Sequence, residues 1–413
     1  MRSRASARIV AALAAALAVG LTACSVSPGG RDTTTEEPLV LEFIGAISAG
    51  ARAPQVPAAA EAAAAAINAQ GGVAGRPIKI EVCDHRNTAE GEAACAQDLA
   101  RNDVIALIGN QVTNTTAVVD ASVKNKIANI GLAGVGATDL VEASTTSFPI
   151  AVAAMSLLAC PGPLKDAGAA QIGTVALDTG GGAALVAGVQ AVVGKLPGTT
   201  YTTGARVAYS ENNLAAPVQT VLNAGTTGAV TALAQPQLIS TLSSNNGRMK
   251  ICSSDGVATT ADLKGLGQAA DGFIVASPVP PSSLAGGTGE DGRRFVTEMD
   301  AYYASSKNEA AAPERRNGAA LTAWMSVHAF ADIAGGLPDI TRESVTDAFS
   351  KTTNLDFPGL LAAPIDFTKT TPVPNMARLH NSLYSGYRWD AAVGNYVATG
   401  KTYDVISLLQ GRA

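Results

Sequence analysis

Short apolar runs alternate with stretches of helical periodicity from Leu39 onward, and this order constrains the fold more than any other feature of the chain. Strands that alternate with helices form parallel sheets, because each crossover needs a dozen or more residues and lays its helix on a face of the sheet. The first strands are predicted at residues 40–45, 78–82, 104–109 and 128–132, with helices at 54–69, 90–101 and 115–125. This part of the chain is therefore predicted to form a parallel α/β lobe.

The same alternation resumes after Ser147, which predicts a second α/β lobe. Its strands are predicted at residues 172–177, 205–209, 229–233, 249–252 and 273–276. Its helices are predicted at residues 152–167, 183–193, 214–223, 236–244 and 261–266. Longer helices are predicted at 292–306, 318–333 and 341–350, and strands of the tail at 379–389 and 396–399.

The N-terminus has the pattern of an export signal. Three arginines in the first eight residues precede an apolar run at residues 9–21, which is shorter than the roughly 20 residues that span a bilayer. The run ends in Leu21-Thr22-Ala23-Cys24, which resembles the lipobox of bacterial lipoproteins. We therefore expect a signal peptide at 1–23, a lipid on Cys24 and a flexible tether at 24–38. The alternative is an ordinary signal peptide cleaved nearby.

Charge and hydropathy exclude two classes of function. The chain carries a net charge of −5 without a Lys/Arg cluster, so it offers no electrostatic footprint for nucleic acid or anionic lipid. Beyond Cys24, no apolar stretch approaches the length that spans a membrane. DNA binding and integral membrane function are therefore not expected.

The four remaining cysteines are predicted to form two disulfides, because an even number in an exported protein favours bridges over metal binding. Cys83 closes a predicted strand and Cys95 lies on the next helix, so packing of the helix on the strand predicts this pair. Cys160 and Cys252 pair by elimination. The chain has no CxxC motif and its three histidines are scattered, so we expect no metal site and no cofactor.

Enzyme motifs find little support in the sequence. The triplet Asp178-Thr179-Gly180 matches an aspartic-protease motif, but no second such triplet supplies the partner carboxylate. Gly134-Val135-Gly136 has Asp139 where a dinucleotide-binding motif needs glycine, and no Walker A loop or nucleophile elbow occurs. Catalysis is not predicted.

Hydroxyl and amide side chains follow the strand at 104–109, from Asn110 to Thr116, before the next helix. This turn places hydroxyls and free backbone N–H groups at the carboxyl edge of a parallel sheet, which suits an anion or a carboxylate. The alternative is that Thr113 or Thr115 only caps the helix.

One segment resembles a known family. Residues 65–78, AAINAQGGVAGRPI, resemble the INAxGGxxGRxI segment of type I periplasmic binding proteins, most closely the leucine/isoleucine/valine-binding proteins of ABC importers. Weaker matches follow in the family's order, at residues 104–109 with the threonine-rich turn, 215–225, 268–273 and 365–368. The resemblance runs from about Leu39 to the C-terminus.

The resemblance implies two Rossmann-like α/β lobes joined by three crossovers, with a ligand in the cleft between them and closure of the lobes around it. It places the N-terminal lobe at residues 39–150 plus 279–353. The C-terminal lobe then comprises residues 151–278 plus 354–413.

The resemblance also implies site residues. Thr113 matches the residue that holds the ligand carboxylate, Ala133 a backbone contact, and Asp255 the acid that pairs with the ligand ammonium. Their neighbours Asn114 and Gly134 complete this part of the expected site. For Asp255, the alternative is a simple Asp-Gly turn after the strand at 249–252.

Departures from the family pattern leave the ligand open. Arg52 lies near the position of an expected tyrosine, and Gly180-Gly181-Gly182 replaces another. Arg52 is expected either to bind a second acidic group or to remain a solvated loop charge. The ligand is thus an amino acid, an amide or a small organic acid.

The resemblance implies a lipid-anchored, extracytoplasmic binding protein that delivers its ligand to an ABC permease and is not an enzyme. One alternative is a ligand-sensing receptor subunit of the same fold. The other is a cell-surface hydrolase, for which Asp178 would be required.

Overall fold

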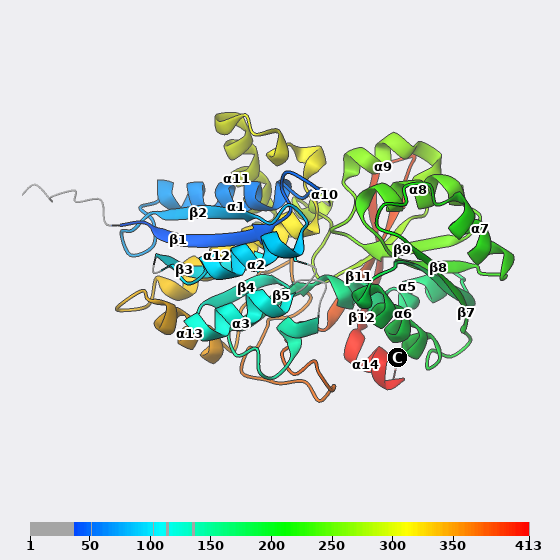
Figure 1. Cartoon of the computed structure of the whole chain (residues 1–413). Coiled ribbons are helices and arrows are strands. Elements are labelled where there is room, and N and C mark those ends of the chain that lie inside the picture. The colour runs from blue at the N-terminus through cyan, green and yellow to red at the C-terminus, as the bar shows by residue number, and fades with distance from the viewer. Residues whose placement is uncertain (1–36, 51, 102, 113–114, 134–136, 413) are drawn as a thin grey trace, which may run out of the picture. The chain divides into compact units, whose positions relative to one another are not determined.

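The computed structural model describes residues 37–50, 52–101, 103–112, 115–133 and 137–412. They belong to one compact unit, Glu36–Ala413, in which two α/β lobes each contain one sheet (Figure 1). The predicted α/β fold is confirmed. The predicted signal peptide and Cys24 lie outside the described residues.

The first sheet has five parallel strands in the order β2-β1-β3-β4-β5. Their bounds are β1 Leu39–Gly45, β2 Ile78–Asp84, β3 Val104–Asn110, β4 Ala128–Ala133 and β5 Ser147–Val152. Every residue of β1 is buried, as expected for a strand near the centre of a sheet covered on both faces.

Helices from two distant parts of the chain cover this sheet. They are α1 Gln55–Ala69, α2 Ala89–Asp98, α3 Thr115–Asn125, α11 Glu290–Ser306, α12 Gly318–Ala334 and α13 Arg342–Lys351. The helix α12 packs against α1 and crosses β4 closely, since a Cβ atom at Gly131 would lie 1.7 Å from Oγ of Ser326. The chain therefore returns to the first lobe after it has built most of the second.

The second sheet has seven strands in the order β12-β11-β10-β9-β8-β6-β7, and β11 runs antiparallel to both of its neighbours, β10 and β12. The strands are β6 Gln171–Leu177, β7 Thr200–Val207, β8 Gly228–Ala232, β9 Lys250–Ser254, β10 Ile274–Ser277, β11 Leu383–Asp390 and β12 Asn395–Asp404. Its helices are α4 Ala153–Ala159, α5 Pro161–Asp166, α6 Gly180–Val193, α7 Ala215–Asn223, α8 Gln235–Asn245, α9 Thr260–Leu266 and α14 Val405–Gln410. Short helical turns complete the described chain: η1 Ala137–Leu140, η2 Gly267–Ala270, α10 Ser282–Ala285, η3 Glu309–Ala311 and η4 Pro313–Arg315.

Several element predictions were wrong in detail. The strand β5 was missed, because Pro149 and the polar residues before it obscure its strand pattern. The single helix predicted at 152–167 is two helices that meet at Cys160, where prolines follow. The strand predicted at 205–209 is β7, which begins at Thr200 in a polar stretch, and α14 was not predicted.

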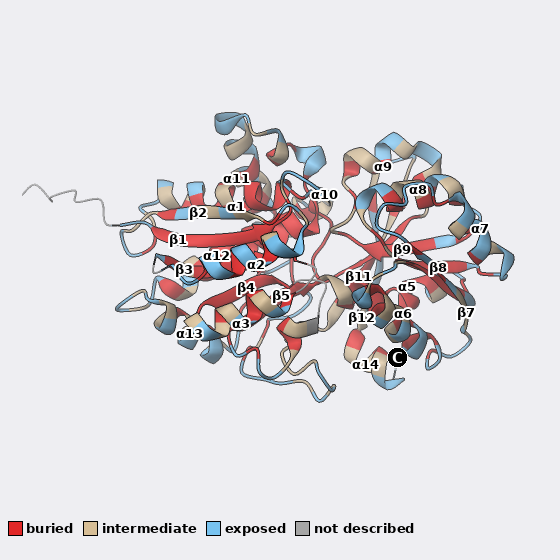
Figure 2. Ribbon diagram, in the orientation of Figure 1, coloured by how far each residue is buried: buried red, intermediate tan, exposed pale blue. Residues whose placement is uncertain are grey.

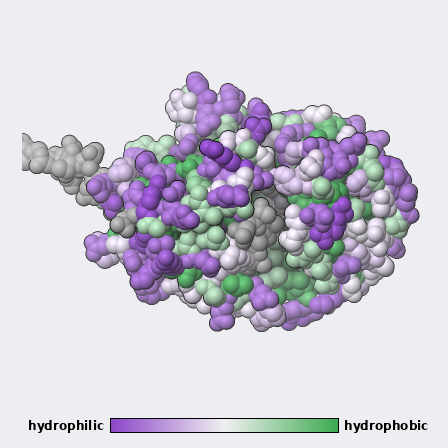
Figure 3. Space-filling view, in the orientation of Figure 1, coloured by the Kyte–Doolittle hydropathy of each residue, from purple (hydrophilic) through white to green (hydrophobic). Residues whose placement is uncertain are grey.

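The buried residues are concentrated in the strands of the two sheets. In Figure 2 the strands of both sheets are largely buried, whereas the outer faces of the helices are exposed. The viewed face in Figure 3 is dominated by hydrophilic side chains, with smaller hydrophobic areas between them. Among the described residues, the exposed large apolar side chains are Val82, Tyr209, Val393 and Val397. Apolar side chains are thus concentrated in the interior.

Both predicted disulfides are present. Cys83 on β2 is bonded to Cys95 on α2, and Cys160 is bonded to Cys252 on β9. The second bond fixes the junction of α4 and α5 to the strand that runs toward Asp255.

A segment near the C-terminus runs beside β5 before it enters the second sheet as β11. Its side chains bond to backbone carbonyls of β5: Nε of Arg378 donates to Ser147 at 2.9 Å, and Nδ2 of Asn381 donates to Ile150 at 3.0 Å. The hydroxyl of Tyr384 donates to the last carbonyl of β5 at 3.2 Å. Side-chain hydrogen bonds therefore join the segment that leads into β11 to β5, the last strand of the first sheet.

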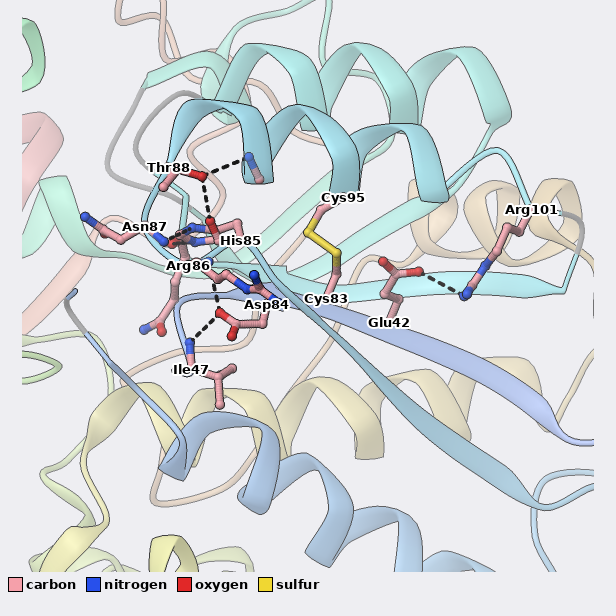
Figure 4. Close-up of a disulfide and its surroundings, with 12 residues drawn as sticks. Glu42, Ile47, Cys83, Asp84, His85, Arg86, Asn87, Thr88, Cys95 and Arg101 are labelled. Atoms are coloured by element: carbon pink, nitrogen blue, oxygen red, sulfur yellow. Dashed lines mark hydrogen bonds and ion pairs between the residues drawn. A yellow bond between two sulfur atoms is a disulfide. The ribbon is translucent and has the colours of Figure 1, made fainter. Parts of the chain in front are cut away.

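Glu42 is an ionisable residue in the core of the first lobe, only 2% exposed. Burial raises its pKa to about 7, although the Arg101 guanidinium lies 3.4 Å from Oε2 and favours the charged form (Figure 4). Because the unfolded chain ionises this group at lower pH, ionised Glu42 opposes folding. We expect Glu42→Gln to raise the free energy of unfolding by up to about 3 kcal/mol at pH 8 and to have little effect at pH 4. Urea unfolding at the two pH values measures the difference, and equal effects at both would contradict it.

Candidate functional site

The strands of the first sheet run in the same direction, so the residues that end them lie at one edge. These are Gly45, Asp84, Asn110 and Ala133 for β1 to β4. Ligands of parallel α/β folds bind at this carboxyl edge, in the loops that follow the strands. Of the predicted contacts, Ala133 is buried at the end of β4. Thr113, Asn114 and Gly134 lie outside the described residues.

Arg52 lies in the loop between β1 and α1, and it is exposed. The backbone N–H of Ala53 donates to the carbonyl of Ala46 at 2.9 Å, which closes the loop, and the N–H of Arg52 donates to Gly50 at 2.9 Å. These two bonds join the described ends of the loop, while Arg52 is open to solvent.

A buried polar network stabilises the same edge of the sheet. Asp139 on η1 is fully buried, and its Oδ1 accepts hydrogen bonds from Nδ2 of Asn129 at 2.9 Å and of Asn110 at 3.4 Å. These contacts connect β3, β4 and η1. Oδ1 of Asn110 and Oγ1 of Thr115 have no hydrogen-bond partner among the described residues. Thr115 therefore does not cap α3, and two buried acceptors flank the threonine-rich turn.

Asp255 lies in a turn directly after β9, so the predicted Asp-Gly turn is present. Its side chain is 4% exposed, however, and its carboxylate accepts a hydrogen bond from the backbone N–H of Gly318 at the start of α12. A Cβ atom at position 318 would lie 2.3 Å from Oδ2, so glycine permits this approach. A carboxylate from the second lobe thus meets the N-terminus of a helix that packs on the first sheet.

A second contact reinforces this meeting. Asn317 caps α12, since its Oδ1 accepts from the backbone N–H of Ala320 at 3.1 Å. Its Nδ2 donates to the carbonyl of Gly256 at 3.0 Å. Asp255 and Gly256, which follow β9, are therefore each hydrogen-bonded to a residue at the beginning of α12.

Asp255 is enclosed by other residues of the protein. Burial raises its pKa to about 7, and the single hydrogen bond from Gly318 only partly opposes this shift. Burial also raises the pKa of Tyr387 to about 12 and holds the pKa of Tyr396 well above its ordinary value, and the charge of Asp255 adds to both shifts. Among the described residues, neither Oδ2 of Asp255 nor the Tyr396 hydroxyl has a hydrogen-bond partner. A buried carboxylate oxygen without a donor is well placed to accept one from a ligand.

The structure brings some of the predicted residues near one another and separates others. Asp255 contacts the first residue of α12, and α12 packs against β4, which ends at Ala133. Arg52 belongs to the loop after β1, and within the described part of the chain no hydrogen bond or ion pair joins it to Asp255 or to α12. The predicted helix start at Gly318 is confirmed, and the Asn-Gly pair before this long apolar helix is an N-cap signature, but neither Asn317 nor Gly318 was expected in the site.

The described part of the chain offers neither a cluster of metal-binding side chains nor a membrane-spanning helix. No group of three or more histidine, cysteine, aspartate or glutamate side chains is placed there to hold a metal ion. None of the helices described is both long enough and apolar enough to cross a membrane.

Comparison with known proteins identifies a family. A family model described as periplasmic binding protein matches residues 44–378. No curated protein sequence matches the chain. Among solved structures, the chain is similar to a fatty acid ABC transporter substrate-binding protein from Thermomonospora curvata, at 17% identity and a TM-score of 0.72, over 90% of this chain and 94% of that one.

Two other solved structures have the same fold. A leucine-binding protein from Thermotoga maritima is 13% identical, with a TM-score of 0.66, over 89% of this chain and 99% of that one. A solute-binding protein of an ABC transporter from R. palustris, in complex with benzoate, is 14% identical, with a TM-score of 0.68, over 88% of this chain and 96% of that one.

Proposed function

The chain belongs to the periplasmic binding protein family, and we propose that it captures a small organic molecule outside the cytoplasm and delivers it to an ABC permease. In this role the protein binds its ligand and releases it without changing it chemically. Ligand binding would shift the population of the protein toward the state in which the two lobes are closed around the ligand.

We propose that the ligand is an amino acid, an amide or a small organic acid. Asp255 carries this proposal, because one oxygen of its buried carboxylate has no donor among the described residues and the side chain stands at the junction of the two lobes. It would bind an ammonium or amide group. Thr113 and Asn114, with the backbone at Ala133 and Gly134, would bind a carboxylate. Arg52 would contact a second acidic group.

Leucine and benzoate test the proposed ammonium-binding and carboxylate-binding residues separately. Both compounds carry a carboxylate, but only leucine carries an ammonium group. Calorimetry of the mature domain should detect binding of a compound of one of these classes. A ligand at 100 times its Kd raises the free energy of unfolding by about 2.7 kcal/mol, which a thermal-shift assay detects. Absence of binding across amino acids, amides and small carboxylates would contradict the proposed ligand class.

Asp255→Asn tests the ammonium anchor. Loss of a buried ionic partner weakens binding by about 2–5 kcal/mol, so leucine should bind at least about thirtyfold more weakly, while benzoate should bind as before. Asp178→Asn is the matched control, since that carboxylate is 63% exposed and pairs with Arg206. It should leave both affinities unchanged, and it also tests for the hydrolase, which predicts a turnover that depends on Asp178. Equal leucine binding by wild type and Asp255→Asn would remove Asp255 from the site.

We further propose that a lipid on Cys24 anchors the protein to the cell membrane. Cys24→Ala should move the protein from the membrane fraction to the soluble fraction, because acyl chains contribute about 0.8 kcal/mol for each buried methylene group. Retention of the variant in the membrane fraction would show that another part of the chain provides the attachment.

A further inference from the structure

We infer that the turn between β2 and α2, residues 84–88, is a brace that positions two neighbouring loops, the loop after β1 through residues 47–50 and the loop after β3 through Gln111. Asp84 and His85 are its positioning residues, and neither needs to touch the ligand. The inference deepens the proposed function and rests on it, because it concerns loops that contribute the expected ligand contacts. Its evidence lies in the contacts of the turn with its neighbours.

Asp84 holds the loop between β1 and α1. Its Oδ1 accepts hydrogen bonds from the backbone N–H groups of Ile47 and Arg86, both at 3.0 Å, and its Oδ2 accepts from the N–H of Ser48 at 3.2 Å and from the Ser48 hydroxyl (Figure 4). Burial opposes ionisation of Asp84, but these hydrogen bonds lower its pKa to about 2. The carboxylate is thus committed to the backbone of a loop outside its own turn.

Asn87 adds a steric contact with the same loop. Gly50 has a φ of +68°, and a Cβ atom there would lie 2.4 Å from Cβ of Asn87. The two loops therefore pack directly on each other a few residues before Arg52.

His85 reaches the loop after β3. Its Nε2 lies 3.1 Å from the carbonyl oxygen of Gln111, while its Nδ1 accepts from the backbone N–H of Asn87 at 3.0 Å. Because Nδ1 accepts, Nε2 carries the hydrogen and donates to Gln111. In the sheet, β1 lies between β2 and β3, so the imidazole spans the end of β1. A single buried side chain, 1% exposed, thus connects two loops that are not adjacent in the sheet.

The brace is itself fixed at its base. The Cys83–Cys95 disulfide joins the residue before Asp84 to α2 and encloses the turn (Figure 4). The helix also sits tightly on His85, because a Cβ atom at Gly91 would lie 2.1 Å from the His85 carbonyl oxygen. A turn held at both ends can transmit position to the loops that it contacts.

Two substitutions at position 85 separate the brace from general stability. Glutamine keeps a donor near the position of Nε2, whereas asparagine keeps an acceptor near that of Nδ1 but lacks the donor. Hydrogen exchange of the peptide that contains Gln111 should be about fivefold faster in His85→Asn and unchanged in His85→Gln, in line with loss of one hydrogen bond. Equal exchange in the two variants would overturn the inference.

Asp84→Ala tests the other arm. It should accelerate exchange in the peptide that contains Ser48 by a similar factor and leave the peptide that contains Gln111 near the wild-type rate. Global unfolding in urea, measured for each variant, shows that the protein is folded under the exchange conditions. Acceleration spread over both lobes would mean general destabilisation and would overturn the inference.

Binding provides the functional readout, with leucine and benzoate as probes. A probe that binds the wild type should bind His85→Asn about tenfold more weakly and His85→Gln within about threefold. If exchange changes as expected and binding does not, the turn does not position the ligand loops and the inference is wrong. If neither probe binds the wild type, the ligand assignment fails, and exchange alone still decides whether the brace exists.

Discussion

Replacing Cys160 and Cys252 together by alanine will lower the free energy of unfolding by about 4–5 kcal/mol. The bond closes a loop of 92 residues, and loop closure restricts the unfolded chain more as the loop grows. The same double replacement of Cys83 and Cys95 will cost only about 3 kcal/mol, because that loop spans 12 residues.

Urea unfolding of the two double variants beside the oxidised wild type measures both values. Each double variant introduces two alanines in place of buried or half-buried cysteines, so the pair is a matched comparison of loop length. An equal or larger loss from the short loop would contradict the ranking and would mean that native contacts at Cys83 and Cys95 outweigh chain entropy.

Ionisation of Asp255 will lower the free energy of unfolding by up to about 4 kcal/mol as the pH rises from about 4 to about 7. Its folded-state pKa of about 7 lies above its ordinary value of 3.8, so the folded protein binds more protons than the unfolded chain between these pH values. Ionisation of Asp255 therefore opposes folding. Asp255→Asn should remove this part of the pH dependence and be the more stable protein at pH 8.

Urea unfolding of wild type and Asp255→Asn at pH 4, 6 and 8 provides the measurement. Glu42 contributes in the same direction and the same pH range, so Glu42→Gln should be measured in parallel. A variant that gains stability at pH 8 and still loses leucine would show that the loss comes from the missing charge and not from misfolding. Parallel pH profiles for wild type and Asp255→Asn would contradict the prediction.

Much of the fold could be predicted because the buried strands are nearly continuous apolar runs separated by helices. The strand Val104–Asn110 and the helix Thr115–Asn125 were placed within a residue of their observed ends. The strand Ser147–Val152 was not, because Pro149 interrupts its apolar run and polar residues precede it. The sequence pattern was therefore sufficient to predict a strand where its own residues form an uninterrupted apolar run.

The site was harder to predict, because its contacts join residues that are distant in the chain. The side chain of Asn317 bonds to Gly256, which is 61 residues away, and His85 bonds to Gln111 across an intervening strand. Neither link has a sequence pattern, since hydrogen bonds from Asn and His to backbone carbonyls leave no periodicity. The resemblance to a family indicated Asp255, whereas its burial and its contact with Gly318 required the structure.

The antiparallel hairpin of β11 and β12 affects the order in which the chain can be completed during synthesis. The first sheet has all its strands by residue 152, but β10 acquires its second neighbour only when residues 383–390 have been made. Until then a nascent chain exposes the edge of β10, which is the kind of edge that pairs wrongly with other chains. Shortening the protein at its C-terminal end would thus remove the edge strand β12 first and then β11, the neighbour that covers β10.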